Sequence, residues 1–235
     1  MVEIEQVQKR ILIHSRWTLS NRAGGAQAID VVMQRGFALS HPHAVGPDIG
    51  TPTSKRFMAD NPGRIKSATV GDAGVVGKVE GSFLLRALVS SRLVQWATLS
   101  GGGPIGGRIY CAAANSVGYR LIKPSREVKA DYLAGSTRFA KLRGQVGFLG
   151  SYPTETPALE RDVTRIEAPV QVLHGEFDTF VSVSNSRRLA DLLPNSRFAV
   201  IPGAAHYAWE DNPSDYLDKV LSFIDEVEAS ANLVA

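Results

Sequence analysis

The chain has little cysteine: among its 235 residues, Cys111 is the single one. One cysteine cannot close a disulfide within the chain, and it cannot supply a metal site built from several thiolates. A reducing compartment is therefore expected. The sequence also lacks the spacing of His, Asp and Glu that is typical of metal sites, so it predicts no metal and no cofactor.

Long apolar runs are missing as well. The most apolar stretch, residues 83–99, is interrupted by Arg86 and Arg92, whereas a membrane-spanning helix needs about 20 consecutive apolar residues. The first ten residues, MVEIEQVQKR, are polar and acidic where a secretory signal would be basic and then apolar. We therefore expect a cytoplasmic protein with no membrane partner.

Net charge is low, at +3 near neutral pH, which is too small to argue for a nucleic-acid partner. The charge is unevenly spread, because the residues from Lys78 to Arg143 include eleven Lys or Arg and only three acidic residues. This basic segment is either a solvated helical surface or a positive field that attracts anionic substrates. The sequence leaves both interpretations open.

The composition, with 44% hydrophobic and 21% charged residues, is that of a globular protein with one sizeable core. Short apolar stretches predict strands, and periodic apolar stripes predict helices between them. The predicted strands cover residues 10–14, 37–46, 64–71, 169–174 and 197–201, and the predicted helices cover 25–35, 52–60, 183–193 and a last helix that begins near Pro213. This alternation predicts an α/β fold, with a mostly parallel sheet and helices on both faces.

Between residues 75 and 159 the pattern changes to helical, basic and glycine-punctuated segments. We expect these residues to form a helical lid inserted into a core made of residues 1–74 and 160–235. Within the lid, residues 101–106 match the glycine pattern of dinucleotide sites. Because a helical stretch precedes them and Pro104 lies inside the pattern, we expect a flexible hinge instead.

Three candidate catalytic residues follow predicted strands. Asp48 lies in GPDIG at a strand-to-helix turn, Asp178 lies in HGEFDTFV after the strand 169–174, and His206 lies in PGAAHYAWED after the strand 197–201. Because the carboxyl ends of parallel strands share one edge of a sheet, these side chains are expected to meet there. Simpler interpretations stay open: Asp48 as a cap of the helix that begins near Pro52, and Asp178 as a turn residue.

The order of these residues is that of the α/β-hydrolase superfamily, in which nucleophile, acid and histidine follow one another. The segments around HGEFD and PGAAH resemble its acid and histidine motifs. HAVGPDIGTPTSKRFMADNPGRIKSATVGDAG resembles the nucleophile region of its aspartate branch, the epoxide hydrolases and haloalkane dehalogenases. ILIHSRW resembles the strand whose following turn supplies an oxyanion-hole amide.

The resemblance implies a role for each matching residue. Asp48 would be the nucleophile, Asp178 the acid and His206 the base, and the amides of Ile49 and Ser15 would form the oxyanion hole. The substrate-binding candidates in the lid are Tyr110, Tyr119, Tyr132 and Tyr152. Asp72 is a reserve acid, because part of the family places its acid after that strand.

An aspartate nucleophile suits attack on saturated carbon, which leaves an alkyl ester on the enzyme. The sequence therefore predicts a hydrolase of a small organic substrate, with epoxide hydrolysis first. The alternatives are a haloalkane or haloacid dehalogenase, although Ile49 offers no donor for a halide, and a non-catalytic protein that binds a small molecule in the same cleft. A homodimer is left open.

The chain departs from the family at several positions. Pro47 stands where histidine is common before the nucleophile, Thr51 where glycine is common, and Ser15 where glycine is common. Between residues 36 and 45 the chain is too short for the strand and crossover helix of the family. We expect a sheet shortened at one edge, with the strand 10–14 beside the strand that leads to Asp48 and the helix 25–35 moved to the other face.

Overall fold

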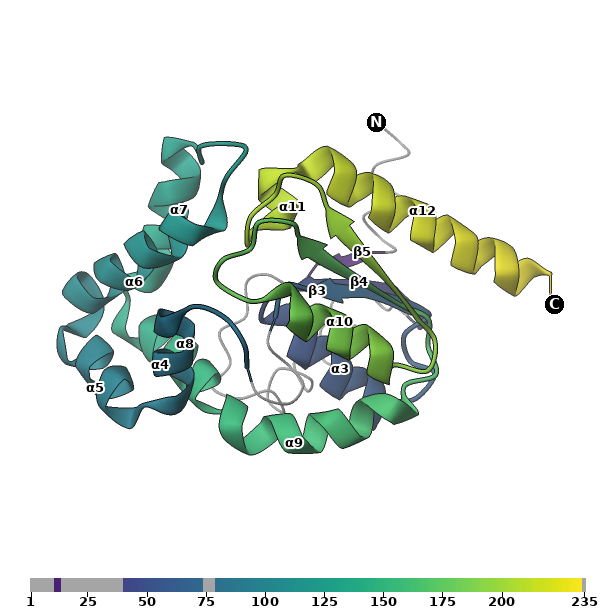
Figure 1. The fold of residues 1–235 in the computed structure, drawn as a ribbon, viewed down its shortest axis with the longest axis horizontal. Coiled ribbons are helices and arrows are strands. Elements are labelled where there is room, and N and C mark those ends of the chain that lie inside the picture. Colours follow the sequence, from purple (N-terminus) through teal and green to yellow (C-terminus); the bar gives the residue numbers. More distant parts are fainter. Residues whose placement is uncertain (1–10, 14–39, 74–78, 234–235) are drawn as a thin grey trace.

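The computed structural model describes residues 11–13, 40–73 and 79–233. Its centre is a parallel sheet with the strand order β1-β2-β3-β4-β5 (Figure 1). The strands are β1 (Ile11–Ile13), β2 (His43–Pro47), β3 (Ser67–Gly71), β4 (Val170–Gly175) and β5 (Ser196–Ile201). The predicted α/β fold is therefore confirmed, and β1 pairs directly with β2, as expected for a sheet shortened at this edge. The predicted helix 25–35 lies outside the described residues.

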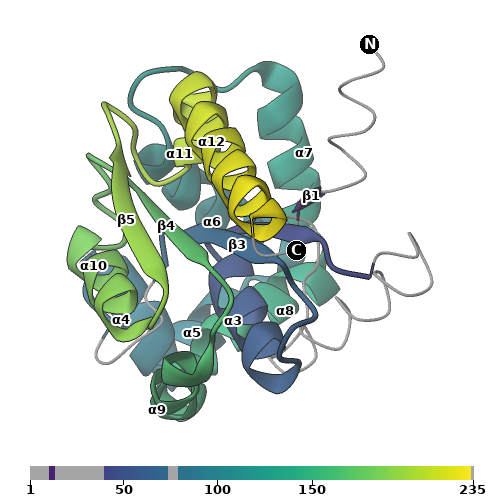
Figure 2. The same ribbon diagram turned by 90° about the vertical axis from the view of Figure 1, so that its right-hand side faces the viewer.

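Helices cover both faces of the sheet. On one face lie α3 (Gly50–Asp60) and α10 (Val183–Leu192), and across the other runs the long helix α12 (Pro213–Asn232), as Figure 2 shows. The alternation of side chains along each strand explains this division. On β4, Val172 packs into the cluster that contains Phe57 of α3, whereas the next residue, Leu173, packs into the cluster that contains Val220 of α12.

A run of helices separates β3 from β4 in the sequence and projects to one side of the sheet (Figure 1). We call residues 83–162 the lid segment. It contains α4 (Phe83–Ser90), α5 (Arg92–Ser100), α6 (Gly102–Gly118), α7 (Arg126–Ser136), α8 (Phe139–Gly150) and α9 (Tyr152–Asp162), and a short 3-10 helix, η2 (Val163–Arg165), leads back to β4. The fold is thus the expected one, an α/β sheet with an inserted helical segment.

Serine residues set the beginnings of three lid helices. The hydroxyls of Ser82, Ser91 and Ser125 accept backbone N–H groups in the first turns of α4, α5 and α7, the usual N-cap interaction. The hinge expected at residues 101–106 is wrong, because helix α6 begins at Gly102. Close packing of this helix explains its glycines: a Cβ at Gly106 would lie 2.2 Å from the carbonyl oxygen of Thr98.

Among the described residues, none of the helices has the length and apolar character needed to cross a lipid bilayer.

Candidate active site

Asp48 occupies the tight turn between β2 and α3. Its φ angle is 50°, a left-handed conformation that costs a non-glycine residue about 1–3 kcal/mol. The turn is fixed by the Asp48 N–H, which donates to the Gly71 carbonyl at 2.9 Å. It also depends on Gly46, where a Cβ would lie 2.7 Å from the Ser54 hydroxyl. Since α3 begins without a side-chain capping bond, helix capping does not explain Asp48.

The hydroxyl of Thr51 stabilises this turn through hydrogen bonds to backbone groups of Gly46 and Gly71. Its hydroxyl lies 2.9 Å from the Gly46 carbonyl and 2.7 Å from the Gly71 carbonyl, and it accepts the Gly71 N–H at 2.8 Å. The side chain is completely buried. Thr51 therefore ties the ends of β2 and β3 together, a contact that glycine could not make.

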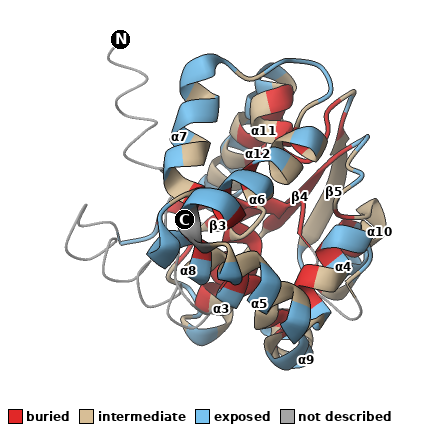
Figure 3. Ribbon diagram, turned by 90° about the vertical axis from the view of Figure 1, so that its left-hand side faces the viewer, coloured by how far each residue is buried: buried red, intermediate tan, exposed pale blue. Residues whose placement is uncertain are grey.

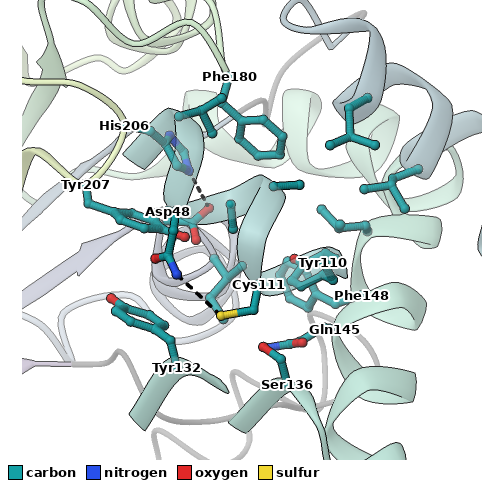
Figure 4. Close-up of a pocket in the computed structure, with 18 of the residues that line it drawn as sticks. Asp48, Tyr110, Cys111, Tyr132, Ser136, Gln145, Phe148, Phe180, His206 and Tyr207 are labelled. Carbon is teal, nitrogen blue, oxygen red and sulfur yellow. Dashed lines mark hydrogen bonds and ion pairs between the residues drawn. The ribbon is translucent and has the colours of Figure 1, made fainter. Parts of the chain in front are cut away.

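Asp48, His206 and Asp178 meet at the carboxyl edge of the sheet. His206 Nδ1 donates to Asp178 Oδ2 at 2.8 Å, and His206 Nε2 lies 3.8 Å from Asp48 Oδ1. Figure 4 shows the imidazole directed at the Asp48 carboxylate. The contact expected between His206 and Asp178 is present, and it leaves Nε2 facing Asp48.

Asp178 combines the two interpretations that the sequence left open. Its Oδ1 accepts the N–H groups of Phe180 and Val181 at 2.8 and 2.9 Å, while Oδ2 accepts His206. The carboxylate is fully buried as a side chain, so these hydrogen bonds replace its hydration. The same residue thus forms the turn and orients the imidazole.

Burial and neighbouring charges have opposite effects on the pKa values of His206 and Asp48. Burial disfavours a charged His206, but the neighbouring Asp178 carboxylate and its hydrogen bond outweigh burial, with help from Asp48, and raise the pKa of His206 to about 9. Burial raises the pKa of Asp48 from its usual value, and His206 and the backbone amide of Ile49 counteract that rise. The oxyanion-hole role expected of the Ile49 amide stays a prediction. Ser15, the other expected donor, lies outside the described residues.

Asp72 lies behind this group, at the end of β3, and is completely buried. Its Oδ1 accepts the Gly175 N–H at 2.9 Å, and its Oδ2 has no hydrogen-bond partner among the described residues. Burial, together with the Asp178 carboxylate, raises the pKa of Asp72 well above its usual value. The Asp72 carboxyl group therefore holds a proton more readily than an ordinary aspartate. Asp178, rather than Asp72, accepts the hydrogen bond from His206.

Metal-ligating atoms of Asp72, His174 and Asp178 lie within 4.8 Å of one another. However, both nitrogens of His174 are engaged: Nδ1 lies 2.8 Å from the Ser186 hydroxyl, and Nε2 donates to the Val181 carbonyl at 3.2 Å. Burial lowers the pKa of His174, which keeps it neutral. The imidazole therefore acts as a structural bridge, and the arrangement does not fit a metal ion.

A cavity of about 220 Å³ lies beside Asp48 and His206, between the sheet edge and the lid segment (Figure 4). Its walls are largely apolar and come from α4, α6 and α8 and from the loops after β4 and β5. Representative wall residues are Leu88, Ile109, Phe148, Phe180 and Trp209. The arrangement suits a small apolar molecule placed next to the Asp48 carboxylate.

Two of the four tyrosines expected to bind substrate line this cavity, namely Tyr110 and Tyr132. Tyr119 instead donates its hydroxyl to Glu210. Tyr152 is buried in the hydrophobic core, with its ring centroid 6.0 Å from that of Phe148. Tyr152 is buried away from the cavity because α9, which carries it, packs against α3 and α8.

Sequence reasoning missed Tyr207, which follows His206 and lines the cavity. Its ring stacks on Tyr132 at 5.6 Å between centroids and packs edge-on against Tyr119 at 5.3 Å. Gly118 makes room for it, since a Cβ there would lie 2.3 Å from the Tyr207 ring. The position of Tyr207 directly after the candidate catalytic His206 could have indicated from the sequence that it lies at the site.

The short helix α11 (Ala208–Asp211) holds the lid segment against the His206 loop. Glu210 accepts the hydroxyl of Tyr132 at 2.5 Å and the hydroxyl of Tyr119. The buried Asp211 carboxylate accepts four backbone N–H groups, those of Arg120, Leu121, Ile122 and Ala205, at 2.8 to 3.0 Å. These bonds connect the segment between α6 and α7 to the residue before His206.

No family model matches the chain. A sequence comparison finds similarity to a 2-hydroxy-6-oxo-6-(2'-aminophenyl)hexa-2,4-dienoic acid hydrolase from Metapseudomonas resinovorans, with 31% identity over 62 residues. This match covers 26% of the chain and 21% of the length of that hydrolase.

Solved structures give broader matches. A structure of a putative non-heme bromoperoxidase from Mycobacterium tuberculosis matches with a TM-score of 0.68 and 18% identity, covering 88% of this chain and 75% of that one. A putative ancestral haloalkane dehalogenase matches with a TM-score of 0.69 and 16% identity, covering 89% and 76%. The shared architecture is the α/β-hydrolase fold.

Proposed function

We propose, from the α/β-hydrolase fold of this chain, that it is a hydrolase of a small organic substrate, that Asp48 is its nucleophile and that its reaction is epoxide hydrolysis. One observation carries the proposal: the Asp48 carboxylate lies on a strained turn at the cavity, 3.8 Å from the Nε2 of a histidine that Asp178 orients. A carboxylate at the nucleophile position favours attack on saturated carbon, because the product is an ester that water can cleave.

In the first step an Asp48 oxygen attacks a ring carbon of the epoxide. The carbon–oxygen bond of the ring breaks, an ester bond to Asp48 forms, and the released alkoxide takes a proton. Tyr110 and Tyr207 both line the cavity, and burial together with the Asp48 charge raises their pKa values. They therefore keep their protons near neutral pH and are the candidate donors to the alkoxide.

In the second step His206 Nε2 removes a proton from water, and the resulting hydroxide attacks the carboxyl carbon of Asp48. The Ile49 amide stabilises the oxyanion, and the ester bond breaks as the protonated His206 gives its proton to the departing alkoxide, which releases the diol. The second proton of the water, now on the Asp48 carboxyl group, passes to the tyrosinate and restores both the tyrosine and the carboxylate. Ester formation removes the Asp48 charge, which is one of the causes that raise the pKa of His206. The pKa of His206 therefore falls on ester formation, so more of the imidazole is neutral and available to take a proton from water.

Dehalogenation is the second candidate, favoured by the structural similarity to a putative haloalkane dehalogenase. It uses the same nucleophile but needs donors for a departing halide. Ile49 has none on its side chain, whereas Asn115 and Trp209 line the cavity and carry N–H groups. A positively charged lid segment would favour a haloacid over a neutral haloalkane. The remaining candidate is a non-catalytic protein that binds a small molecule in this cavity.

Two variants separate the steps of the mechanism. Asp48→Asn should abolish turnover, because a neutral amide is a poor nucleophile. His206→Gln should permit the first step and stall the second, so that alkyl-enzyme accumulates. Intact-protein mass spectrometry after incubation with reactive epoxides and short haloacids should show substrate mass on His206→Gln, on the peptide that contains Asp48.

His43 offers a matched control, since it is also a buried histidine and donates from Nε2 to Glu228 at 2.8 Å, far from the cavity. His43→Gln should hydrolyse substrate without accumulating adduct. A single turnover of wild type in H₂¹⁸O should place ¹⁸O in Asp48. If wild type turns a substrate over while His206→Gln forms no adduct, the covalent mechanism is wrong. A folded wild type that turns over none of a broad panel supports the non-catalytic candidate.

A further inference from the structure

Figure 3 shows parts of α4 and α5 in the pale blue of exposed residues, and the lid segment carries an unusual number of exposed apolar side chains. They come from three consecutive helices, α4, α5 and α6, of which α5 contacts both of the others. We define the lid face as Phe83, Leu84, Leu93, Trp96, Ile105 and Ile109. Phe83 is 80% exposed and Trp96 is 67% exposed, although large apolar side chains are normally buried. A group of this kind marks an interaction surface.

Helix α5 turns two large apolar side chains outward. Leu93 and Trp96, one turn apart, are exposed, as is Arg92. Two of its polar residues point inward: Gln95 donates to the Leu88 carbonyl at 2.8 Å, and Thr98 lines the cavity. A surface helix in water normally turns its apolar stripe toward the core, so the outward stripe of α5 indicates a less polar environment.

The lid face extends to the cavity. Leu84 and Ile109 are exposed to solvent, at 41% and 67%, and both also line the cavity beside Asp48. The lid face and the cavity lining therefore share two apolar side chains.

The charge around the lid face has one sign. Residues 81–126 contain six Lys or Arg and no Asp or Glu. Arg86, Arg92 and Arg108 are exposed on the same three helices, and among the described residues none of them forms a salt bridge. Two copies of this face packed together would bring like charges into contact, which disfavours a homodimer through this surface.

Apolar and aromatic side chains mixed with arginine are typical of elements that lie at the surface of an anionic membrane. The aliphatic and aromatic groups enter the interface while the guanidinium groups bind lipid phosphates. The missing long apolar run excludes a spanning helix but does not exclude this mode of binding. We propose that the lid face docks on an anionic lipid bilayer and places the cavity mouth against it. That the bilayer also delivers an apolar substrate to Asp48 rests on the proposed function.

Vesicle co-sedimentation tests the docking directly. Wild type should bind vesicles of phosphatidylcholine mixed with phosphatidylglycerol and bind pure phosphatidylcholine vesicles much more weakly. The double variant Leu93→Ser with Trp96→Ser should lose at least tenfold in binding, since both side chains lie outside the cavity lining. Each of Arg86→Gln, Arg92→Gln and Arg108→Gln should reduce binding to the anionic vesicles by about fivefold.

Leu217→Ser is the matched control, because Leu217 is an exposed apolar residue on α12, outside the lid segment. It should bind vesicles as wild type does. Tryptophan emission should shift to the blue with anionic vesicles in wild type, and the shift should shrink when Trp96 is replaced.

The proposal is overturned if wild type does not co-sediment with anionic vesicles, or if the double variant binds them as well as wild type does. It is also overturned if sedimentation without lipid shows a dimer that the double variant abolishes, because the face is then a protein interface. Asp48→Asn should bind vesicles normally, and the double variant should hydrolyse a water-soluble substrate normally. Docking and catalysis can therefore fail separately.

Discussion

Three carboxyl groups surround one imidazole, and their neighbours give them different properties. Asp178 accepts three hydrogen bonds, two from backbone N–H groups and one from His206. Asp72 accepts one and keeps an oxygen without a partner among the described residues. Asp48 faces the cavity and the far nitrogen of His206. Asp178 therefore orients the imidazole, whereas burial and the nearby Asp178 carboxylate raise the pKa of Asp72.

This difference predicts opposite results for two similar substitutions. Asp178→Asn removes the largest influence that raises the pKa of His206, so the pKa should fall from about 9 and turnover should fall by about 10³-fold or more. Asp72→Asn keeps an acceptor for the Gly175 N–H and replaces a group that favours its neutral form, so turnover should change by less than about tenfold. Steady-state kinetics and NMR titration of His206 measure both effects. Equal losses in the two variants would contradict the assignment of the acid.

The raised pKa of His206 also predicts a pH dependence of stability. The folded protein binds this proton more tightly than the unfolded chain, with a pKa of about 9 against 6.5. The stabilisation is therefore complete below pH 6.5 and is lost as the pH rises from 6.5 to about 9. Urea unfolding across this range should show a decline that His206→Gln lessens. A decline of the same size in His206→Gln would show that other groups cause it.

At the scale of elements, the short helix α11 connects the lid segment to the loop that carries His206. It begins two residues after His206, and its carboxylates hold both the lid tyrosines and the chain between α6 and α7. The position of the lid segment over the cavity and the position of His206 are therefore set by the same element. Movement of the lid would require these hydrogen bonds to break together.

Asp211→Ala should weaken this connection. It leaves four backbone N–H groups without their acceptor, and we expect a loss of about 3 kcal/mol or more in the free energy of unfolding, with faster proteolysis between residues 119 and 125. Urea unfolding and limited trypsin digestion measure the two effects. Asp218→Ala, at an exposed position on α12, should change neither. Unchanged proteolysis in Asp211→Ala would show that the lid is held by other contacts.

At the scale of the whole molecule, the sheet supports two separate hydrophobic clusters. The larger one lies between the sheet and α3, α10 and part of the lid segment, and the smaller one lies between the sheet and α12. The strands are parallel, and β2, β3 and β4 are buried along their whole length because helices cover both faces of the sheet, whereas β5 is only partly buried. Among the described strands, the short β1 lies at the edge next to β2, so Asp48, which follows β2, lies near that edge.

The smaller cluster should be as necessary for folding as the larger one. Leu173→Ala removes a fully buried side chain from it and should cost about 2–5 kcal/mol. Leu217→Ala, on α12 but 51% exposed, should stay within about 0.5 kcal/mol of wild type. Urea unfolding monitored by circular dichroism measures both. Similar values for the two variants would mean that α12 contributes little to the core.

The sequence by itself determined the features that depend on short-range patterns. Apolar stretches with glycine and proline boundaries located the strands and most helices, since period and turn chemistry are local properties. The parallel sheet then required Asp48, Asp178 and His206 to lie at one edge, because all three follow strands. The helical character of the inserted segment was predictable for the same reason.

Tertiary structure decided what depends on residues far apart in the chain. The choice of Asp178 over Asp72, the placement of Tyr207 beside Tyr132, and the burial of Tyr152 all follow from packing between elements. The outward apolar stripe of α5 had the periodicity of an ordinary helix, and only its neighbours show that the stripe faces away from the core. A periodic pattern fixes which residues share a face, but the contacts of the folded chain decide which way that face points.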